Sequence, residues 1–532
     1  MAFRKPQFLR EMTIRMLRIY LFASIGAMNF GYDNNWWSGV IGAQSFIDHY
    51  GRDNGPNTPR TLPSSWLSAA SGTPIAGWIV GCLTAGYVTS RFGRKKTMVI
   101  ICLIALVGMV IQCAVRNYWA LMVGRLINAV SMGIEANTVP MYMAELAPAS
   151  IRGGLVNFYQ TWLYVGAILA SALVYASTKH FQGQWAYMLP IVVQLLPPVM
   201  LLCSVWFIPE SPRWLLQKGR RDAAHKAFFY IHEHSATKDQ IALELDTIEQ
   251  AMILESENHR ATSYTDCFKG SNARRSLVAI GVQTLQQAQG NSFFTSYLVI
   301  FLKQVGVQEP QLIACAKICC CLAGCFAAFY LTDKIGRRPM LMGGSFFMAG
   351  LMMTVSGLAS WTPGGVSGAS AQGCIAAILL HGVFSAATWG STMWTVTTEV
   401  ATTQLRERTI ALATVIGFVA SLLITYINPF IQNEPGNLGT RVGMIYGSIS
   451  LLSLAFVFLF VPEMKHKSLE ELDQLFHANI PAWRSHHFVI TASTTKISDI
   501  EAPELDDPTK VDEVIYKNAQ DAKLAKTTAS ES

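Results

Sequence analysis

Long apolar runs recur along the 532-residue chain and are separated by short polar segments. Seven of these runs contain no Asp, Glu, Lys or Arg, and the longest, residues 339–398, has room for two membrane spans. A helix needs roughly 20 mostly apolar residues to cross the hydrocarbon core of a bilayer. The pattern therefore predicts twelve spanning helices, near residues 19–41, 66–88, 97–115, 118–142, 154–176, 186–208, 276–304, 311–332, 339–360, 372–397, 409–430 and 441–461.

Composition also indicates an all-α membrane protein in contact with a lipid bilayer. Hydrophobic residues make up 51% of the chain and charged residues 14%, with a mean hydropathy of +0.31. An ordinary soluble domain has about 25% charged residues. The net charge of +7 gives no reason to expect a nucleic-acid partner, because the basic residues are concentrated in particular loops.

The distribution of Lys and Arg among the loops predicts the orientation. The segment before the first span and the second-to-third, eighth-to-ninth and tenth-to-eleventh connections are rich in basic residues, whereas the connections on the other side are poorer. The positive-inside rule then places both termini in the cytoplasm. The apolar run after the basic N-terminus is too long for the core of a cleavable signal peptide, so we interpret it as the first span.

These assignments divide the chain into five parts. Residues 242–256 of the polar linker are predicted to form an amphipathic helix, and residues 491–532 to be disordered. The predicted parts are an N-terminal cytoplasmic segment 1–18, a first six-helix bundle 19–208, a cytoplasmic linker 209–275, a second six-helix bundle 276–462 and a largely disordered cytoplasmic tail 463–532.

Three short patterns occur twice in the same order, about 250 residues apart. They are "RFGRKK" and "KIGRRP", "ELAPASIR" and "EVATTQLR", and "PESPRW" and "PEMK". The duplication predicts two bundles in parallel orientation, a transporter layout in which the substrate binds between the halves near the bilayer midplane. In that layout we expect Asp33, the sole charged residue between 19 and 47, to border a wet cleft.

The motifs resemble the sugar porter family of the major facilitator superfamily over about residues 15–480. The resemblance rests on "PESPRWLL" at 209–216, "DKIGRRP" at 333–339 and a fourth-span pattern, in which Ala129 and Ser131 replace family glycines. It implies the major facilitator fold and uniport or proton symport of hexoses, pentoses, disaccharides, polyols or related acids, with no chemistry on the substrate. The matching fourth-span residues are Gly124, Arg125, Gly133, Pro140, Tyr142, Glu145, Arg152 and Gly153.

Asp33 is the predicted proton-coupling group. A carboxylate inside the bilayer costs a few kcal/mol and must face a cavity or a partner. The resemblance supplies Arg125 as that partner, and implies that an acid at this position is typical of proton symporters. The alternative is a static pair that holds two helices together. Glu135 has no counterpart in the family pattern; it is a further proton group, a substrate contact or a residue without a role.

Sugar recognition requires amide and hydroxyl groups and an aromatic face. Gln283, Gln286 and Gln287 share one face of an apolar span at i, i+3 and i+4. The alternative, hydrogen bonding between helices, explains one or two such residues but not this density. With the matches that the resemblance adds, the predicted substrate-binding set is Gln160, Gln286, Gln287, Asn291, Ser292 and Trp394.

Several positions depart from the polar set that the family carries in its second half. Cys321, Gly417 and Ser421 stand where the family has asparagines, and Ser391 stands in place of a proline. A standard hexose would lose hydrogen bonds at such a site. The departures therefore favour a solute that is larger, less hydroxylated or an unusual polyol.

Charged residues at the predicted cytoplasmic ends form candidate gating ion pairs, which would stabilise the outward-facing state. The positive-inside rule alone explains why basic residues lie at these ends. It does not explain the acidic residues there. The predicted set is Arg94, Glu145, Arg152, Glu210, Arg213, Asp333, Arg337, Arg338, Glu399 and Arg406.

We therefore predict a plasma-membrane importer of a sugar or sugar-like solute that uses the proton as coupling ion. The alternatives are an exporter or antiporter of a non-sugar metabolite and a transporter-like nutrient sensor. An enzyme is not expected, since no nucleotide loop, zinc signature or nucleophile elbow is present. The 11 cysteines do not form a metal framework, no cofactor is expected, and the oligomeric state is left open.

Overall fold

A computed structural model describes most of the chain between residues 14 and 487. The described residues are 14–53, 55, 59–146, 152–232, 246, 249–250, 263–360, 368–402, 405–465, 467, 472, 475–476, 478 and 481–487. Side chains are described at these positions except 14, 144, 152–157, 329 and 333. The predicted disordered segment 491–532 and nearly all of the predicted amphipathic helix 242–256 lie outside these residues.

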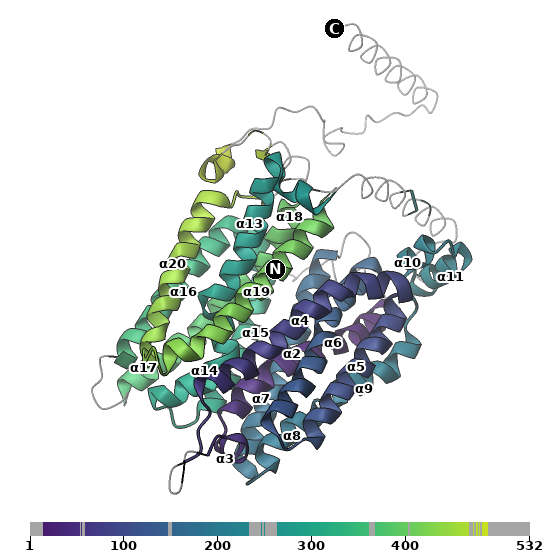
Figure 1. Ribbon diagram of the computed structural model, residues 1–532. Helices are drawn as coiled ribbons and strands as arrows, with labels where there is room; N and C mark the ends of the chain where they lie inside the picture. The colour runs from purple at the N-terminus through teal and green to yellow at the C-terminus, as the bar shows by residue number, and fades with distance from the viewer. Residues whose placement is uncertain are drawn as a thin grey trace, which may run out of the picture. The chain divides into compact units, whose positions relative to one another are not determined.

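The first half of the chain forms a bundle of six spans (Figure 1). Five spans are single helices, and the sixth is divided between α8, α9 and the short η2. The elements are α2 (Ile14–Ile41), α3 (Gln44–Tyr50), α4 (Ser64–Phe92), α5 (Arg94–Ala114), α6 (Tyr118–Leu146), α7 (Arg152–His180), α8 (Trp185–Val193), α9 (Leu196–Ser204) and η2 (Val205–Phe207).

The second half repeats this arrangement with six more spans, two of which contain a π-helical turn. The elements are α13 (Gly270–Gln286), η4 (Gln287–Asn291), α14 (Ser292–Val305), α15 (Pro310–Ile335), α16 (Arg337–Ser360), α17 (Ala369–Phe384), η5 (Ser385–Gly390), α18 (Ser391–Val400), α19 (Arg406–Gln432) and α20 (Val442–Phe460). Outside the spans lie α10 (Pro212–Gln217), α11 (Arg221–His232), η3 (Tyr264–Phe268), η6 (Gly439–Arg441) and η7 (Ala482–His487).

The predicted all-α architecture with twelve spans is confirmed. In the described part of the chain, nine helices are long and apolar enough on composition alone to cross a membrane. The other three spans are α2, α6 and the segment α13–η4–α14, which contain Asp33, Arg125 with Glu135, and the glutamine cluster. Each of these three less apolar spans therefore holds predicted functional residues, whereas Gln160 and Trp394 lie in two of the nine apolar helices.

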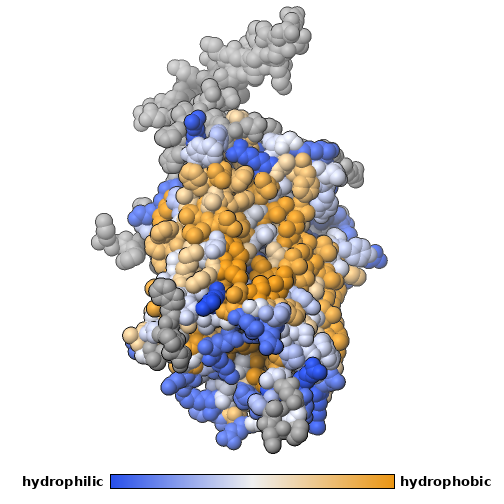
Figure 2. Space-filling model, turned by 60° about the vertical axis from the view of Figure 1, so that its left-hand side comes forward, coloured by the Kyte–Doolittle hydropathy of each residue, from blue (hydrophilic) through white to orange (hydrophobic). Residues whose placement is uncertain are grey.

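The outer surface matches a helical bundle embedded in lipid. Hydrophobic residues cover the middle of the face seen in Figure 2, and hydrophilic residues gather toward its two ends. Large apolar side chains on the spans, such as Leu83, Val107, Phe346 and Leu452, are more than half exposed. A soluble protein rarely leaves so much apolar surface in water, whereas in a bilayer this surface contacts acyl chains.

Close contact between α4 and α6 depends on glycine. A Cβ on Gly81 would lie 2.3 Å from the carbonyl oxygen of Val130, and a Cβ on Gly133 would lie 2.3 Å from that of Trp78. Small residues allow helix backbones to approach closely in a membrane. This contact fixes the position of α6, the helix that holds Arg125.

One end of the spans repeats a capped turn in both halves, which explains the duplicated sequence motifs. Glu210 accepts hydrogen bonds from the backbone N–H groups of Arg94 and Lys95, at 2.9 and 3.2 Å. Glu463 does the same for Arg337 and Arg338, at 3.1 and 3.2 Å. A carboxylate is stabilised at a helix N-terminus by free N–H groups and by the helix dipole. We call this end of the spans the basic end, and the opposite end the α3 end.

Candidate functional site

Asp33 lies inside the first half, where three N–H groups surround its carboxylate. It is 7% exposed. Its Oδ1 accepts hydrogen bonds from Nδ2 of Asn128 at 2.8 Å and from Nε1 of Trp36 at 3.2 Å. Gln194, in the break between α8 and α9, donates a third hydrogen bond to the same oxygen. Hydrogen bonds to a charged acceptor offset part of the cost of burying it.

Arg125 is also 7% exposed, but its guanidinium is held by different groups. Its Nη1 donates a hydrogen bond of 2.5 Å to the carbonyl oxygen of Ala70 in α4. Its Cζ lies 3.7 Å from the ring centroid of Trp37 and 5.4 Å from that of Trp36. Cation–π contacts are worth about 2 kcal/mol or more when desolvated, so these rings stabilise the buried cation.

The two charges do not form a direct ion pair in this conformation. Among the described side chains, no guanidinium nitrogen of Arg125 lies within 4.0 Å of a carboxylate oxygen of Asp33. Trp36 connects the two, because its N–H group donates to Asp33 and its ring faces Arg125. The static pair considered from the sequence is therefore not formed here.

The expectation that Asp33 borders a cleft between the halves is not met in this conformation. All of its hydrogen-bond donors belong to the first half, on α2, α6 and the α8–α9 break. Arg125 is linked to the second half through Trp37, whose ring it faces and which lies in one buried cluster with Tyr297 of α14. The sequence of α2 shows that Asp33 is an unusual charge in an apolar run. It does not show which half of the protein surrounds the carboxylate.

Glu135 is enclosed within the first half and is 0% exposed. Its Oε2 accepts a hydrogen bond of 2.9 Å from Asn29, one turn before Asp33 on α2. A Cβ on Gly26 would lie 2.7 Å from its Oε1. The side chain thus faces α2.

The glutamine cluster lies where α13 passes into the π-helical turn η4. Gln287 accepts a hydrogen bond of 2.8 Å from the hydroxyl of Ser292, which also lies 2.8 Å from the hydroxyl of Ser421 in α19. Gln286 is partly buried, and its Oε1 has no partner among the described residues. The structure therefore brings Gln287 and Ser292 together and leaves an amide oxygen of Gln286 available.

Gln160 reaches the second half through a neighbouring tyrosine. It lies one turn before Tyr164 on α7. The Tyr164 hydroxyl would lie 3.6 Å from a Cβ built on Gly390, the last residue of η5. Helix α7 and the second half therefore meet beside the π-helical turn of the tenth span.

The remaining predicted substrate residues lie beside the two π-helical turns. Asn291 ends η4, and Trp394 lies one turn beyond η5; both are partly buried. Among the residues with described side chains, no hydrogen bond joins Gln160, Gln286 or Gln287 to Trp394. A π-helical turn inside an α-helix is frequent at functional sites, and here the two turns flank the predicted sugar-binding residues.

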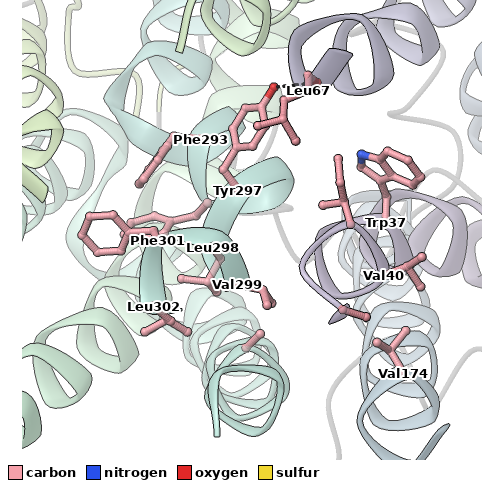
Figure 3. Packing of buried hydrophobic residues seen from close by; sticks show 14 of the residues in the cluster. Trp37, Val40, Leu67, Val174, Phe293, Tyr297, Leu298, Val299, Phe301 and Leu302 are labelled. Carbon is pink, nitrogen blue, oxygen red and sulfur yellow. Dashed lines mark hydrogen bonds between the residues drawn. The ribbon is translucent and has the colours of Figure 1, made fainter. Parts of the chain in front are cut away.

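The halves are joined at the α3 end by the packing shown in Figure 3. The Tyr297 hydroxyl donates to the carbonyl oxygens of Leu67 in the first half, at 3.3 Å, and Thr425 in the second, at 2.8 Å. Apolar residues of α14 lie in one buried cluster with residues of α2 and α4. Lys179 and Glu309 form an ion pair of 3.7 Å between the halves.

A cavity of about 630 Å³ opens near this ion pair. Residues of both halves line it, from α3, the end of α7, the end of α14 and the start of α15. Its lining includes Gln44, Lys179, Lys303 and Glu309.

At the basic end, the ion pairs lie within each half. Arg94 Nη2 lies 2.5 Å from Glu145, and Arg337 Nη2 lies 2.9 Å from Glu399. The first pair is almost fully buried, with side chains 9% and 10% exposed. The structure thus forms two of the predicted pairs.

The other members of the predicted gating set have different surroundings. Arg338 donates to the carbonyl oxygen of Phe458 at 3.0 Å. Arg213 and Arg406 are partly buried and have no ion pair within 4.0 Å among the described side chains. The side chains of Arg152 and Asp333 lie outside the described residues.

A family model described as sugar (and other) transporter matches residues 19–476. The chain belongs to the sugar (and other) transporter family. The resemblance that the sequence motifs indicated is thereby confirmed.

Two relatives in this family are a transporter and a sensor. The chain is 28% identical over 520 residues to the probable glucose transporter rco-3 of Neurospora crassa, covering 94% of this chain and 86% of that protein. It is 28% identical over 483 residues to the high glucose sensor RGT2 of Saccharomyces cerevisiae, covering 89% of this chain and 62% of that protein.

A solved structure agrees with the fold of this family member. The proton:xylose symporter XylE of E. coli, bound to 6-bromo-6-deoxy-D-glucose, superposes with a TM-score of 0.70 at 22% identity. The match covers 87% of this chain and 99% of that one. The predicted major facilitator fold is confirmed.

Several polar residues in the spans of this family member were not predicted from the sequence. Asn128 and Gln194, which bind Asp33, are neutral and therefore gave no signal as charges in an apolar run. Lys317 did give that signal, because it is the sole charged residue between 310 and 332. Lys317 thus shares with Asp33 the pattern of a lone charge in an apolar run.

Proposed function

We propose that this protein imports a sugar or sugar-like solute across the plasma membrane by alternating access, with the proton as coupling ion. The observation that carries the proposal is the buried Asp33 carboxylate, held by Asn128 and Trp36 beside the Arg125 guanidinium. The family relationship and the proteins that share it support a solute of this class. No chemistry on the solute is part of the proposal.

The basic end is proposed to face the cytoplasm, together with both termini. Its loops carry Arg94, Lys95, Arg337 and Arg338, which favour retention on the cytoplasmic side. The halves are joined at the other end through Tyr297 and the buried cluster around it. The described conformation is then the one closed toward the outside, and the cavity near Lys179 is the start of the outer entrance. The Arg94–Glu145 and Arg337–Glu399 pairs are formed within each half in this conformation, so these two pairs are not specific to the outward-facing state.

Asp33 and Arg125 are proposed to couple proton movement to this change. A charged carboxylate inside a bilayer is costly, so Asp33 is expected to exchange its proton when a rearrangement alters its hydrogen bonds and its access to water. Trp36 and Trp37 contact Arg125 and lie in one buried cluster with Tyr297 of the second half. Movement of α14 would therefore change the surroundings of Arg125 and, through Trp36, those of Asp33.

The solute is proposed to bind between the two π-helical turns. Gln286 and Gln287 would supply amide groups and Trp394 a ring face, while Gln160 would complete the site from the first half. A buried amide left without a partner costs about 1–3 kcal/mol. The unpartnered oxygen of Gln286 therefore favours a hydrogen-bonding solute at this position.

Two other functions remain as outcomes of the test. The second half has fewer polar residues at the family's substrate-binding positions, because Gly417, Ser421 and Cys321 stand in place of asparagines. This difference favours an exporter or antiporter of a non-sugar metabolite as one alternative. A nutrient sensor would follow from the relationship to the yeast glucose sensor.

The test is uptake of labelled sugars and polyols by cells that lack their own sugar uptake, measured at external pH 5 and 7 as roughly acidic and neutral conditions. We expect saturable uptake that is faster at the lower pH and is abolished by a protonophore. An uptake rate that changes neither with external pH nor with the protonophore would overturn proton coupling. Efflux without influx would favour an exporter, and a signalling response without uptake would favour a sensor.

A further inference from the structure

A charged residue also lies inside a membrane span of the second half, opposite the half that holds Asp33. Lys317 is seven residues from the start of α15, in a run that is otherwise uncharged from 310 to 332. A lysine at such depth is costly, and an ionisable residue inside a span is a candidate functional group. Its partner therefore has to be identified.

The ammonium group of Lys317 points into the protein. Its Nζ lies 4.4 Å from the ring centroid of Phe294 in α14, and Phe294 is only 2% exposed. A cation can reach the face of a ring so enclosed only from inside the bundle. Helix α17 encloses the stem of the side chain, since a Cβ on Gly382 would lie 3.0 Å from its Cγ.

No acid neutralises this charge. Among the described side chains, no carboxylate oxygen lies within 4.0 Å of Lys317 Nζ. The titratable groups that act on it are His381 of α17 and Cys321 of its own helix. In sequence, the second half places no Asp or Glu between 310 and 332 or between 339 and 398.

His381 adds further hydrogen-bonding capacity beside Lys317. Its ring centroid lies 4.8 Å from that of Phe294, so the imidazole and the ammonium group both contact one aromatic ring. The residue is 2% exposed, and neither Nδ1 nor Nε2 has a hydrogen-bond partner in the described structure. Buried polar atoms are usually paired. A ligand that accepts hydrogen bonds would satisfy both residues.

Lys317 also adjoins the proposed solute site from two directions. Phe294 is two residues beyond Ser292, whose hydroxyl donates to Gln287. Cys321 is one turn from Lys317 on α15, and both face Gly382 of α17, where a Cβ would lie 3.2 Å from the sulfur of Cys321. Further along the same span, a Cβ on Gly390 would lie 3.6 Å from the Tyr164 hydroxyl, one turn beyond Gln160 on α7. Lys317 therefore lies beside the same segments of α14, α15 and α17 that border the proposed solute site.

We propose that Lys317, assisted by His381, binds a carboxylate of the solute, so that the transported compound is a sugar acid or another polyhydroxylated carboxylic acid. The proposal rests on the proposed transport function and specifies its substrate class. An ammonium–carboxylate contact would supply the missing counter-charge and a charge-assisted hydrogen bond. It would also compensate for the hydrogen bonds that the family's asparagines would make at the positions of Cys321, Gly417 and Ser421.

The test compares acidic and neutral probes in the full-length protein. Uptake of labelled D-gluconate and D-galacturonate is measured beside that of D-glucose and D-xylose, in cells without endogenous uptake of these compounds. For Lys317→Gln we expect the ratio of kcat/KM for acid to that for neutral sugar to fall about tenfold or more, as loss of a charged hydrogen bond implies. Lys317→Arg should retain part of the selectivity.

Lys226→Gln is the matched control, because it removes an exposed lysine of α11, outside the spans and the cavity. It should leave the selectivity ratio within twofold of the wild type. Competition of each acid against neutral-sugar uptake in the wild-type protein gives a second readout that does not depend on how the variants fold.

The outcomes separate this inference from the proposed function. Uptake of a neutral sugar that no acid inhibits would overturn the carboxylate site and leave sugar transport standing. A selectivity ratio unchanged by Lys317→Gln in a protein at normal surface level would also overturn it. Failure of every probe to be taken up or exchanged would overturn both.

Discussion

Asn128 of α6 donates a hydrogen bond of 2.8 Å to the carboxylate of Asp33 in α2. The contact joins the first and fourth spans beside Arg125. Asn128 is 1% exposed, so water cannot replace its amide.

We expect Asn128→Leu to impair coupled uptake. Loss of a hydrogen bond to a charged group costs about 1.5–3 kcal/mol, which corresponds to roughly tenfold or more in rate or affinity. The measurement is the initial rate of uptake against a sugar gradient, normalised to surface protein. A rate equal to that of the wild type would show that Asn128 does not support Asp33.

The duplicated turns at the basic end should respond alike to mutation. Gly93 has φ of +85° and Gly336 has φ of +105°. A Cβ at these positions would lie 2.6 Å from Glu210 Oε2 and 2.8 Å from Glu463 Oε2. We expect alanine at either glycine to lower the free energy of unfolding by roughly 1–3 kcal/mol, measured as a lower Tm in detergent.

Gly343→Ala is the control for these substitutions, because no heavy atom lies within 4 Å of a Cβ at that position in α16. Alanine is the better helix former by about 1 kcal/mol, so the Tm should hold or rise. Equal Tm values for all three variants would contradict the capped-turn interpretation.

Much of this organisation could be predicted from the sequence. Apolar runs located the twelve spans, and the repeated motifs around Gly93 and Gly336 predicted two related halves. The sequence could not predict that Glu210 and Glu463 bind backbone N–H groups in those turns, because each acid is more than 100 residues from its partner. Such contacts depend on tertiary packing.

The candidate site was predicted less completely than the fold. Asp33 and Arg125 stand out as charges in apolar spans, but their separation by Trp36 depends on side-chain geometry. The π-helical turns that shape the glutamine cluster gave no recognisable sequence signal, although Gly290 at φ of +101° marks one of them. Neutral partners such as Asn128 are indistinguishable from packing residues in a sequence.

The buried pair of Arg94 and Glu145 should contribute strongly to stability. Removing one partner leaves the other charge buried and unpaired, which costs about 3–5 kcal/mol. We expect Glu145→Gln to lower the Tm markedly, as measured by thermal unfolding of purified protein. The exposed pair of Arg60 and Asp53, with side chains 44% and 72% exposed, is the control. Asp53→Asn should change the Tm little, and an equal effect of both variants would refute the assignment.

Cross-linking of Lys179 to Glu309 tests the closure of the halves at the α3 end. The two side chains approach to 3.7 Å from α7 and α15. The experiment uses a double variant, Lys179→Cys and Glu309→Cys, in a chain without other cysteines. We expect a short bis-maleimide to cross-link this double variant and to abolish most of its uptake. Each single variant, treated in the same way, should remain active. A cross-linked protein that transports at the normal rate would contradict movement of the halves at this end.

Accumulation by Asp33→Asn tests proton coupling most directly. Asparagine keeps the shape of the side chain and removes the titratable carboxyl group. Glu135→Gln is the matched control, since it removes the other carboxylate buried in the first half. Uptake against a gradient and counterflow exchange are measured for both variants, at equal surface levels. We expect Asp33→Asn to lose accumulation and keep exchange, and Glu135→Gln to keep both. Accumulation by Asp33→Asn to the wild-type level would contradict the assignment of proton coupling to Asp33.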